Sequence, residues 1–134
     1  EHQKNKSESI KKMQYLASQL GFHSTKIMSP YDHDEIISYT SQLPHILAVA
    51  LMNSDTQKYN TGKYIGDSFR DLTRIANINE DLWTELFLNN KKYLLSSIKN
   101  FKNQLDIMEK AISENDEEIL KDRFRESSHR REHL

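Results

Sequence analysis

Residues 94–112, LLSSIKNFKNQLDIMEKAI, carry apolar side chains at alternating intervals of four and three residues. The repeat consists of Leu94, Ile98, Phe101, Leu105, Met108 and Ile112. An α-helix turns once every 3.6 residues, so this spacing places all of these side chains along one side of a long helix. The sequence therefore predicts a helix with a continuous apolar seam, buried either in the core of the chain or against a second chain.

The sequence on either side of this helix also favours helical structure. Only three glycines and two prolines occur in 134 residues, too few for the many turns of a β-sandwich or barrel. Apolar residues recur at helical spacing over 7–20 and 33–53, and shorter helices are predicted over 69–76, after Asn79 and after Asp116. The predicted fold class is all-α.

One short segment departs from this pattern, because Thr25-Lys26-Ile27-Met28 is typical of a β-strand that follows a helix ending at Gly21. A single strand is not stable without a neighbouring strand, so this segment suggests a fragment of an α/β sheet. We therefore divide the chain into residues 1–29, the end of an α/β domain, residues 30–113, a helical domain, and residues 114–134, a C-terminal helical tail.

A proline interrupts the helix predicted over 33–53. Pro44 has no backbone N–H, and its ring collides with the carbonyl group of the residue four positions earlier. We expect the helix to kink or break near Thr40. A break within an apolar helix suggests a functional role.

Composition excludes several classes of function. The formal net charge is -1, which gives no reason to expect nucleic acid or an anionic membrane as a partner. No apolar run approaches the ~20 residues that a membrane span needs. There is no cysteine, which rules out disulfides and thiolate metal sites and fits a cytoplasmic location. His33 and His45 have no further ligand close by in the sequence, so we predict no metal site.

Three stretches, taken together, resemble the prephenate dehydrogenase family. The first is MSPYDHD at 28–34, continued by SQLPH at 41–45, which is similar to the family's S-P-x-x-H-D and S-H-L-P-H. The second is FRDLTRIA at 69–76, similar to F-R/K-D-x-T-R-I-A, and the third is LWTELFLNN at 82–90, similar to l-W-x-x-i-f-x-x-N. Two departures are Gln42, where the family often has His, and Gly66-Asp67-Ser68, where it often has a run of glycines.

The resemblance implies a fold and an activity. The chain would be the helical, homodimer-forming half of the enzyme, preceded by the last helix and strand of its nucleotide-binding domain. The whole enzyme removes a hydride from prephenate with NAD, releases carbon dioxide and yields 4-hydroxyphenylpyruvate for tyrosine biosynthesis. The catalytic residues and the glycine-rich NAD loop of the family lie in the other domain, so we expect none here and an inactive isolated chain.

The resemblance also implies four substrate-binding residues in this chain. Arg74 would grip a carboxylate of prephenate with two hydrogen bonds, as a guanidinium does. His45 would line the substrate pocket and, in some members, meet tyrosine as a feedback inhibitor. Ser41 would donate a hydrogen bond near the pocket, and Trp83 would lie beside it or reach in from the partner subunit. The alternatives are a surface Arg74 paired with Asp71 or Asp67, a core His45 and a core Trp83.

Two other functions remain open. The chain could belong to an arogenate dehydrogenase of the same fold, and NADP could replace NAD. It could also be a helical dimerisation module without a ligand. Convergence of Arg74 and His45 on one open cleft would favour substrate binding over the module.

Overall fold

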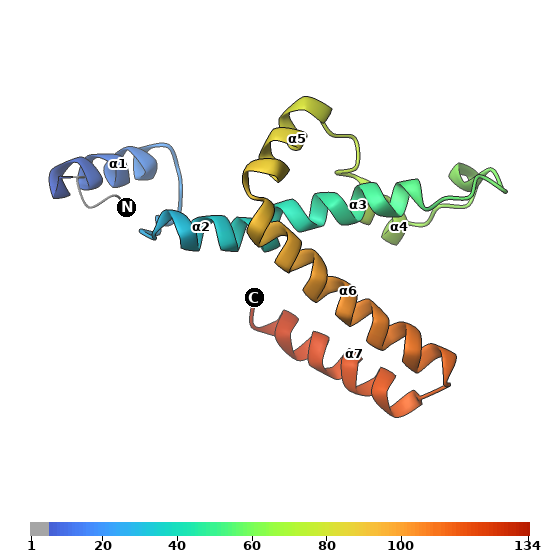
Figure 1. The fold of residues 1–134 in the computed structure, drawn as a ribbon. Coiled ribbons are helices and arrows are strands. Elements are labelled where there is room, and N and C mark those ends of the chain that lie inside the picture. Colours follow the sequence, from blue (N-terminus) through green and yellow to red (C-terminus); the bar gives the residue numbers. More distant parts are fainter. Residues whose placement is uncertain (1–5) are drawn as a thin grey trace. The chain divides into compact units, whose positions relative to one another are not determined.

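The computed structural model describes residues 6–134, and every regular element in that range is helical (Figure 1). The elements are α1 (Ser7–Gln19), α2 (Pro30–Ile37), a π-helical turn η1 (Ser38–Gln42), α3 (Leu43–Asn53), a 3-10 turn η2 (Thr61–Lys63), α4 (Asp67–Thr73), α5 (Glu80–Asn89), α6 (Lys91–Ser113) and α7 (Glu117–Glu132). The all-α prediction is confirmed. Within residues 6–134, no helix is long and apolar enough to cross a membrane.

The prediction of a strand over residues 25–28 is wrong. These residues form neither helix nor strand, and no strand occurs in residues 6–134. The physical reason is that a strand is defined by hydrogen bonds to a neighbouring strand, which this part of the chain does not offer. The segment instead runs back past α1, where the Gln14 amide Nε2 donates to the Thr25 hydroxyl at 3.3 Å.

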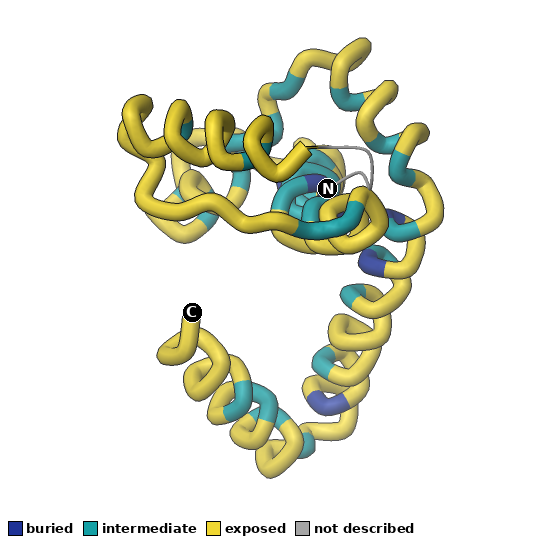
Figure 2. Tube along the Cα trace, turned by 90° about the vertical axis from the view of Figure 1, so that its left-hand side faces the viewer, coloured by how far each residue is buried: buried dark blue, intermediate teal, exposed yellow. Residues whose placement is uncertain are grey.

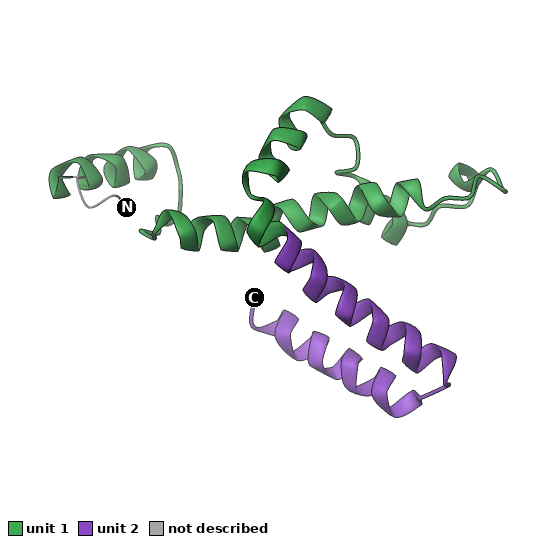
Figure 3. Ribbon diagram, viewed as in Figure 1, with its two compact units in different colours: residues 1–94 green, residues 95–134 purple. Residues whose placement is uncertain are grey.

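The chain divides into two compact units, residues 1–94 and residues 95–134 (Figure 3). The second unit holds most of α6 together with α7, joined by a turn in which Asn115 takes a left-handed backbone conformation (φ 55°). The Asp116 side chain then caps α7 by accepting a hydrogen bond from the Ile119 N–H at 3.0 Å, as its position in the sequence suggested. The three-part division at residues 29 and 113 stays a prediction.

Few side chains are buried in the described residues, as the tube in Figure 2 shows. The buried apolar residues are Leu43, Ala48, Leu94 and Ala111. The predicted long helix is present as α6, but only the start of its seam is buried, since Leu105 and Ile112 are 52% and 62% exposed. Helix α1 buries none of its residues. Large apolar surface on both units is therefore free to be covered by further protein.

Candidate functional site

The site begins at η1, the wide turn between α2 and α3. The Leu43 N–H donates to the Ser38 carbonyl, five residues back, which is the hydrogen bond of a π-helix. Pro44 follows at once, and it has no N–H to give to the carbonyl of Thr40. The predicted interruption near Thr40 is confirmed, and it takes the form of a widened turn without a sharp break.

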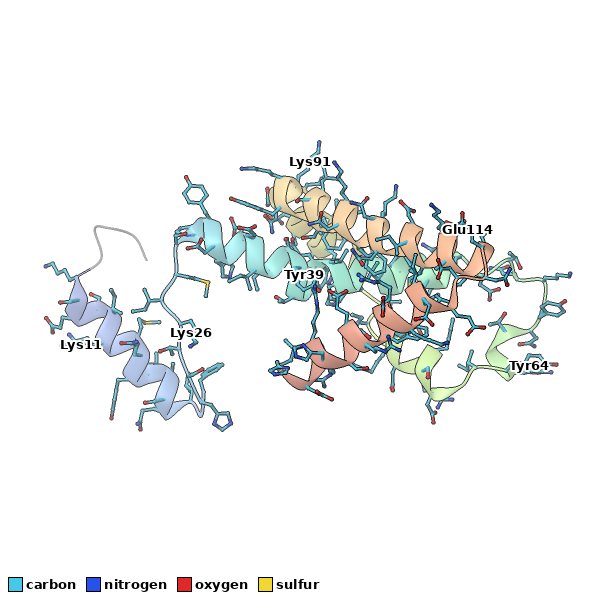
Figure 4. All side chains as sticks on the ribbon, turned by 90° about the horizontal axis from the view of Figure 1, so that it is seen from below. Lys11, Lys26, Tyr39, Tyr64, Lys91 and Glu114 are labelled. Atoms are coloured by element: carbon cyan, nitrogen blue, oxygen red, sulfur yellow. The ribbon has the colours of Figure 1, made fainter. Side chains whose placement is uncertain are left out.

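The π turn brings a polar side chain into the interior. Because the turn closes between residues five apart, Ser38, Gln42 and Leu43 share one side of the helix, and all three are buried (1%, 4% and 3% exposed). Tyr39, labelled in Figure 4, lies in the same turn but is 67% exposed. Gln42 thus points inward from a position where an amphipathic helix would place an apolar residue.

His45 lies in the first turn of α3 and is half-buried. Its Nδ1 atom is 2.9 Å from the carbonyl oxygen of Ser41. A carbonyl oxygen only accepts hydrogen bonds, so Nδ1 carries the proton and donates. In the neutral ring, Nε2 is then left as an acceptor, and no side chain or backbone group of residues 6–134 forms a hydrogen bond with it. Ser41 enters this contact through its backbone.

Trp83 stacks on His45. The two ring centroids are 3.7 Å apart and the ring planes differ by 29°. The Phe87 ring also packs on Trp83, with a centroid distance of 5.4 Å. Trp83 is presented by α5, which begins where the sequence predicts, since the Asn79 side chain accepts a hydrogen bond from the Leu82 N–H at 2.8 Å. The structure therefore brings together three of the four predicted residues, Ser41, His45 and Trp83.

Gln42 and Asn90 form a hydrogen-bonded contact that the sequence did not reveal. The Asn90 amide Nδ2 donates to Gln42 Oε1 at 2.9 Å and to the Asp34 carbonyl at 2.8 Å. The Gln42 amide Nε2 donates to the Leu86 carbonyl at 3.1 Å. We call this group of three hydrogen bonds the Gln42–Asn90 clip. The sequence offered one signal, a polar Gln42 on the apolar side of its helix, but its partner Asn90 lies far away in the sequence.

Arg74, the fourth predicted residue, directly follows the last residue of α4 and is exposed. Helix α4 packs on α3, the helix that carries His45. Within residues 6–134, the Arg74 side chain has no hydrogen bond and no ion pair. Asp67, one of the two partners considered for it, instead pairs with Arg70 at 2.9 Å. No hydrogen bond or ring contact in the described residues joins Arg74 to Ser41, His45 or Trp83, so convergence on one cleft stays a prediction.

A cavity of about 660 Å³ lies elsewhere, between α1 and the segment that leads into α2. Its lining is mostly apolar and includes Ile10, Met13, Ile27 and Met28. Figure 4 labels Lys11 on α1 and Lys26 on the segment that follows it, and Lys26 is one of the lining residues. None of the four predicted site residues lines this cavity. It belongs to the segment around residues 7–33 and does not contribute to the site at His45.

The described residues do not fit a dinucleotide site. Such sites place the pyrophosphate on a glycine-rich loop between a strand and a helix. Residues 6–134 contain no strand, and their glycines, Gly21, Gly62 and Gly66, lie apart from one another. Within the same residues, no group of three or more His, Asp or Glu side chains is arranged to hold a metal ion.

Comparison with known proteins gives consistent relatives. Cyclohexadienyl dehydrogenase of Zymomonas mobilis is 33% identical over 106 residues, covering 75% of this chain and 36% of that protein. Prephenate dehydrogenase of Lactococcus lactis is 35% identical over 104 residues, covering 75% of this chain and 29% of that protein. The chain thus spans about a third of the length of the curated relatives that it matches.

Solved structures agree in fold. Prephenate dehydrogenase of A. aeolicus, in a complex with hydroxyphenyl propionate and NAD+, has a TM-score of 0.82 at 28% identity, covering 100% of this chain and 48% of that one. Arogenate dehydrogenase of Synechocystis has a TM-score of 0.80 at 21% identity, covering 99% and 50%, and at that identity it supports the fold alone. The family described as "Prephenate dehydrogenase, dimerization domain" matches residues 29–126. Since that match takes in most of the chain, the chain belongs to the prephenate dehydrogenase family, through its dimerization domain.

Proposed function

We propose that this chain is the dimerisation and substrate-binding part of an NAD-dependent prephenate dehydrogenase of tyrosine biosynthesis. The full-length enzyme converts prephenate to 4-hydroxyphenylpyruvate and carbon dioxide. Family membership and the names of the relatives support this activity. The observation that carries the substrate-binding role is the unpaired, exposed guanidinium of Arg74, directly after α4, the helix that holds the paired Arg70.

In the proposed site, Arg74 binds one of the two carboxylates of prephenate. A guanidinium presents two parallel N–H donors to a carboxylate, which fixes the orientation of the substrate as well as its position. An arginine already paired with an acid would have to give up that partner first, so the lack of a partner on Arg74 favours it over Arg70. His45, with Nε2 free to accept, then offers a hydrogen-bond acceptor to a hydroxyl group of the substrate.

In the proposal, NAD does not contact this chain. When bound, NAD accepts the hydride that leaves the substrate ring, and the domain that binds it is supplied by the rest of the full-length protein. We therefore expect the 134-residue chain by itself to bind NAD weakly and to produce no NADH from prephenate. Measurable NADH production by that chain would disprove this part of the proposal.

We also propose that the full-length protein is a cytoplasmic homodimer, and that tyrosine inhibits it at the substrate site. The match to a dimerization domain supports the first point. So do the exposed apolar residues of the α6 seam, Leu105 and Ile112, which a second copy of the chain would cover. Tyrosine has an aromatic ring and a carboxylate, as the reaction product does, so the same arginine could bind it.

The test is an activity assay of the full-length protein with prephenate and with arogenate, each with NAD and with NADP. We expect turnover with prephenate and NAD. If only arogenate is turned over, arogenate becomes the proposed substrate, and the proposed fold and role of Arg74 are unchanged. No turnover in any of the four combinations would overturn the proposed function. The remaining interpretation would then be a helical dimerisation module without catalytic activity.

A further inference from the structure

We infer that Gln42 and Asn90 are positioning residues of the substrate site, whose amides hold Trp83 stacked on His45. The inference deepens the proposed function, and its kinetic test rests on that function. It is carried by the Gln42–Asn90 clip, which joins three helical elements near the stacked rings.

The first step is the connectivity of the clip. Asn90 directly follows α5, and its amide nitrogen donates both of its hydrogens, one to Gln42 of η1 and one to the Asp34 carbonyl of α2. Gln42 returns a hydrogen bond to α5 at the Leu86 carbonyl. Two side chains thus tie α5 to α2 and η1 at three points. Hydrogen bonds are directional, so they fix a helix against rotation in a way that apolar contacts do not.

The second step is the short path from the clip to the two rings. Leu86 lies one helical turn after Trp83 on α5, so a bond to its carbonyl holds the turn that carries the indole. Gln42 directly follows Ser41, whose carbonyl accepts the His45 Nδ1 proton. Each end of the Gln42–Leu86 hydrogen bond is therefore within about one turn of one member of the stacked pair. Rotation of α5 at the clip would separate the rings.

The third step is the cost of the arrangement. Gln42 is 4% exposed, and burying an amide is unfavourable unless all its hydrogen-bonding groups are satisfied. In the described residues, no buried side-chain nitrogen or oxygen lacks a partner. An apolar side chain would fill this position at lower cost, whereas a polar network in which each buried atom has a partner favours one arrangement. The clip is therefore better explained by the position in which it holds α5 and Trp83 than by a contribution to the stability of the fold.

The spectroscopic test uses Trp83, the sole tryptophan of this chain. Variants Asn90→Ala and Gln42→Met are made in the full-length protein, each with and without Trp83→Phe, so that the difference spectrum reports Trp83 alone. His45→Ala gives the spectrum of the unstacked indole as a reference. We expect the Trp83 emission of both clip variants to move towards that reference. Asn89→Ala removes the neighbouring exposed asparagine, which is outside the clip, and should leave the spectrum unchanged.

The kinetic test separates positioning from simple support of the fold. For folded clip variants, we expect kcat/KM for prephenate to fall about 10- to 100-fold, since a misplacement of about 1 Å costs on that order. The KM for NAD of the clip variants should stay within about twofold of the unmodified enzyme, because the proposed NAD site lies in the rest of the protein. All constants of Asn89→Ala should do the same, because Asn89 is outside the clip. Absence of prephenate turnover in the unmodified protein would disprove the proposed function and leave the fluorescence test intact.

The inference is overturned if the folded clip variants keep both the Trp83 emission and the prephenate kinetics of the unmodified protein. If Asn90→Ala does not fold, Gln42→Met carries the test, because methionine preserves most of the side-chain volume. Failure of both variants to fold would also overturn the inference, since the clip would then maintain the fold as a whole and not the His45–Trp83 pair.

Discussion

The imidazole of His45 lies flat against the indole of Trp83, with ring centroids 3.7 Å apart and 29° between the ring planes. The two residues come from α3 and α5, so their contact joins two helices that the chain connects only through a long loop and α4. The Ser41 carbonyl fixes the other edge of the imidazole, which restricts the ring to one orientation. The pair is therefore both a packing contact and one wall of the proposed site.

We predict a coupling free energy of about 0.5–1.5 kcal/mol between His45 and Trp83, the usual range for stacked rings. The measurement is a double-mutant cycle of urea unfolding with His45→Ala, Trp83→Leu and the double variant. A control pair within the same unit, such as His45 and the largely exposed Tyr64 (80% exposed), should give coupling close to zero. Additive effects of His45→Ala and Trp83→Leu would contradict a stabilising stack.

We predict that Arg74→Ala in the full-length enzyme raises the KM for prephenate far more than the KM for NAD. Loss of a charge-assisted, two-bond contact costs about 2–4 kcal/mol, or about 30- to 1000-fold in kcat/KM. Arg74→Lys should recover only part of the loss, because an ammonium group lacks the planar fork. Steady-state kinetics with each substrate varied in turn provide the measurement.

Arg125→Ala is the matched control for this prediction. Arg125 is an exposed arginine of α7 that pairs with Asp122 at 2.9 Å, and its loss should leave the prephenate constants unchanged. The unfolding free energy should change by less than about 0.5 kcal/mol in both arginine variants, since both side chains are exposed. Prephenate kinetics within about a factor of two of the unmodified enzyme in a folded Arg74→Ala protein would remove Arg74 from the site.

We predict that Phe101→Asp dissociates the homodimer or unfolds it. Phe101 belongs to the α6 seam, and a charge placed there without a partner is costly once the seam is covered. Light scattering of the unmodified protein should give a dimer, with an interface of about 2,000 Å² or more if the dimer is obligate. Asn103→Asp introduces the same acid at an exposed position nearby and should leave the dimer intact. A monomer at high concentration in the unmodified protein would contradict the prediction.

We predict that residues 7–28 are the least stable of the described segments when the 134-residue chain is studied by itself. Helix α1 buries no residue. Met13 on this helix is 65% exposed, and Leu20 directly after it is 68% exposed. Such a segment opens at little cost in free energy, so its amide hydrogens should exchange with solvent faster than those of α3. Hydrogen exchange measured by mass spectrometry provides the comparison, and slow exchange throughout residues 7–28 would be the contrary result.

The sequence predicted the helices well because their signals are local. Apolar spacing marks α6, the side chains of Asn79 and Asp116 cap α5 and α7, and the missing N–H of Pro44 marks the interruption near Thr40. Each signal acts within one or two turns of helix. The strand predicted at residues 25–28 failed for the opposite reason, because a strand depends on a partner that local sequence does not show.

The site was predictable only in part. Motif resemblance singled out His45 and Trp83 as site residues, but neither periodicity nor capping indicates that their rings touch. The contact between Gln42 and Asn90 was missed altogether, since amides far apart in the sequence leave no local pattern. The width of the π turn was also missed. The absent N–H of Pro44 predicts that the helix is interrupted, but it does not determine whether the interruption is a kink, a break or a π turn.

The π-helical turn also affects how this helix should be aligned with its relatives. A turn closed between residues five apart contains one residue more than a turn of α-helix, while α2 and α3 on either side are α-helical. Deleting Thr40 together with Pro44→Ala would therefore give an uninterrupted helix from Pro30 to Asn53, one residue shorter, in the same register at both ends. Related chains that lack the proline should show a one-residue alignment gap between Ser38 and Gln42.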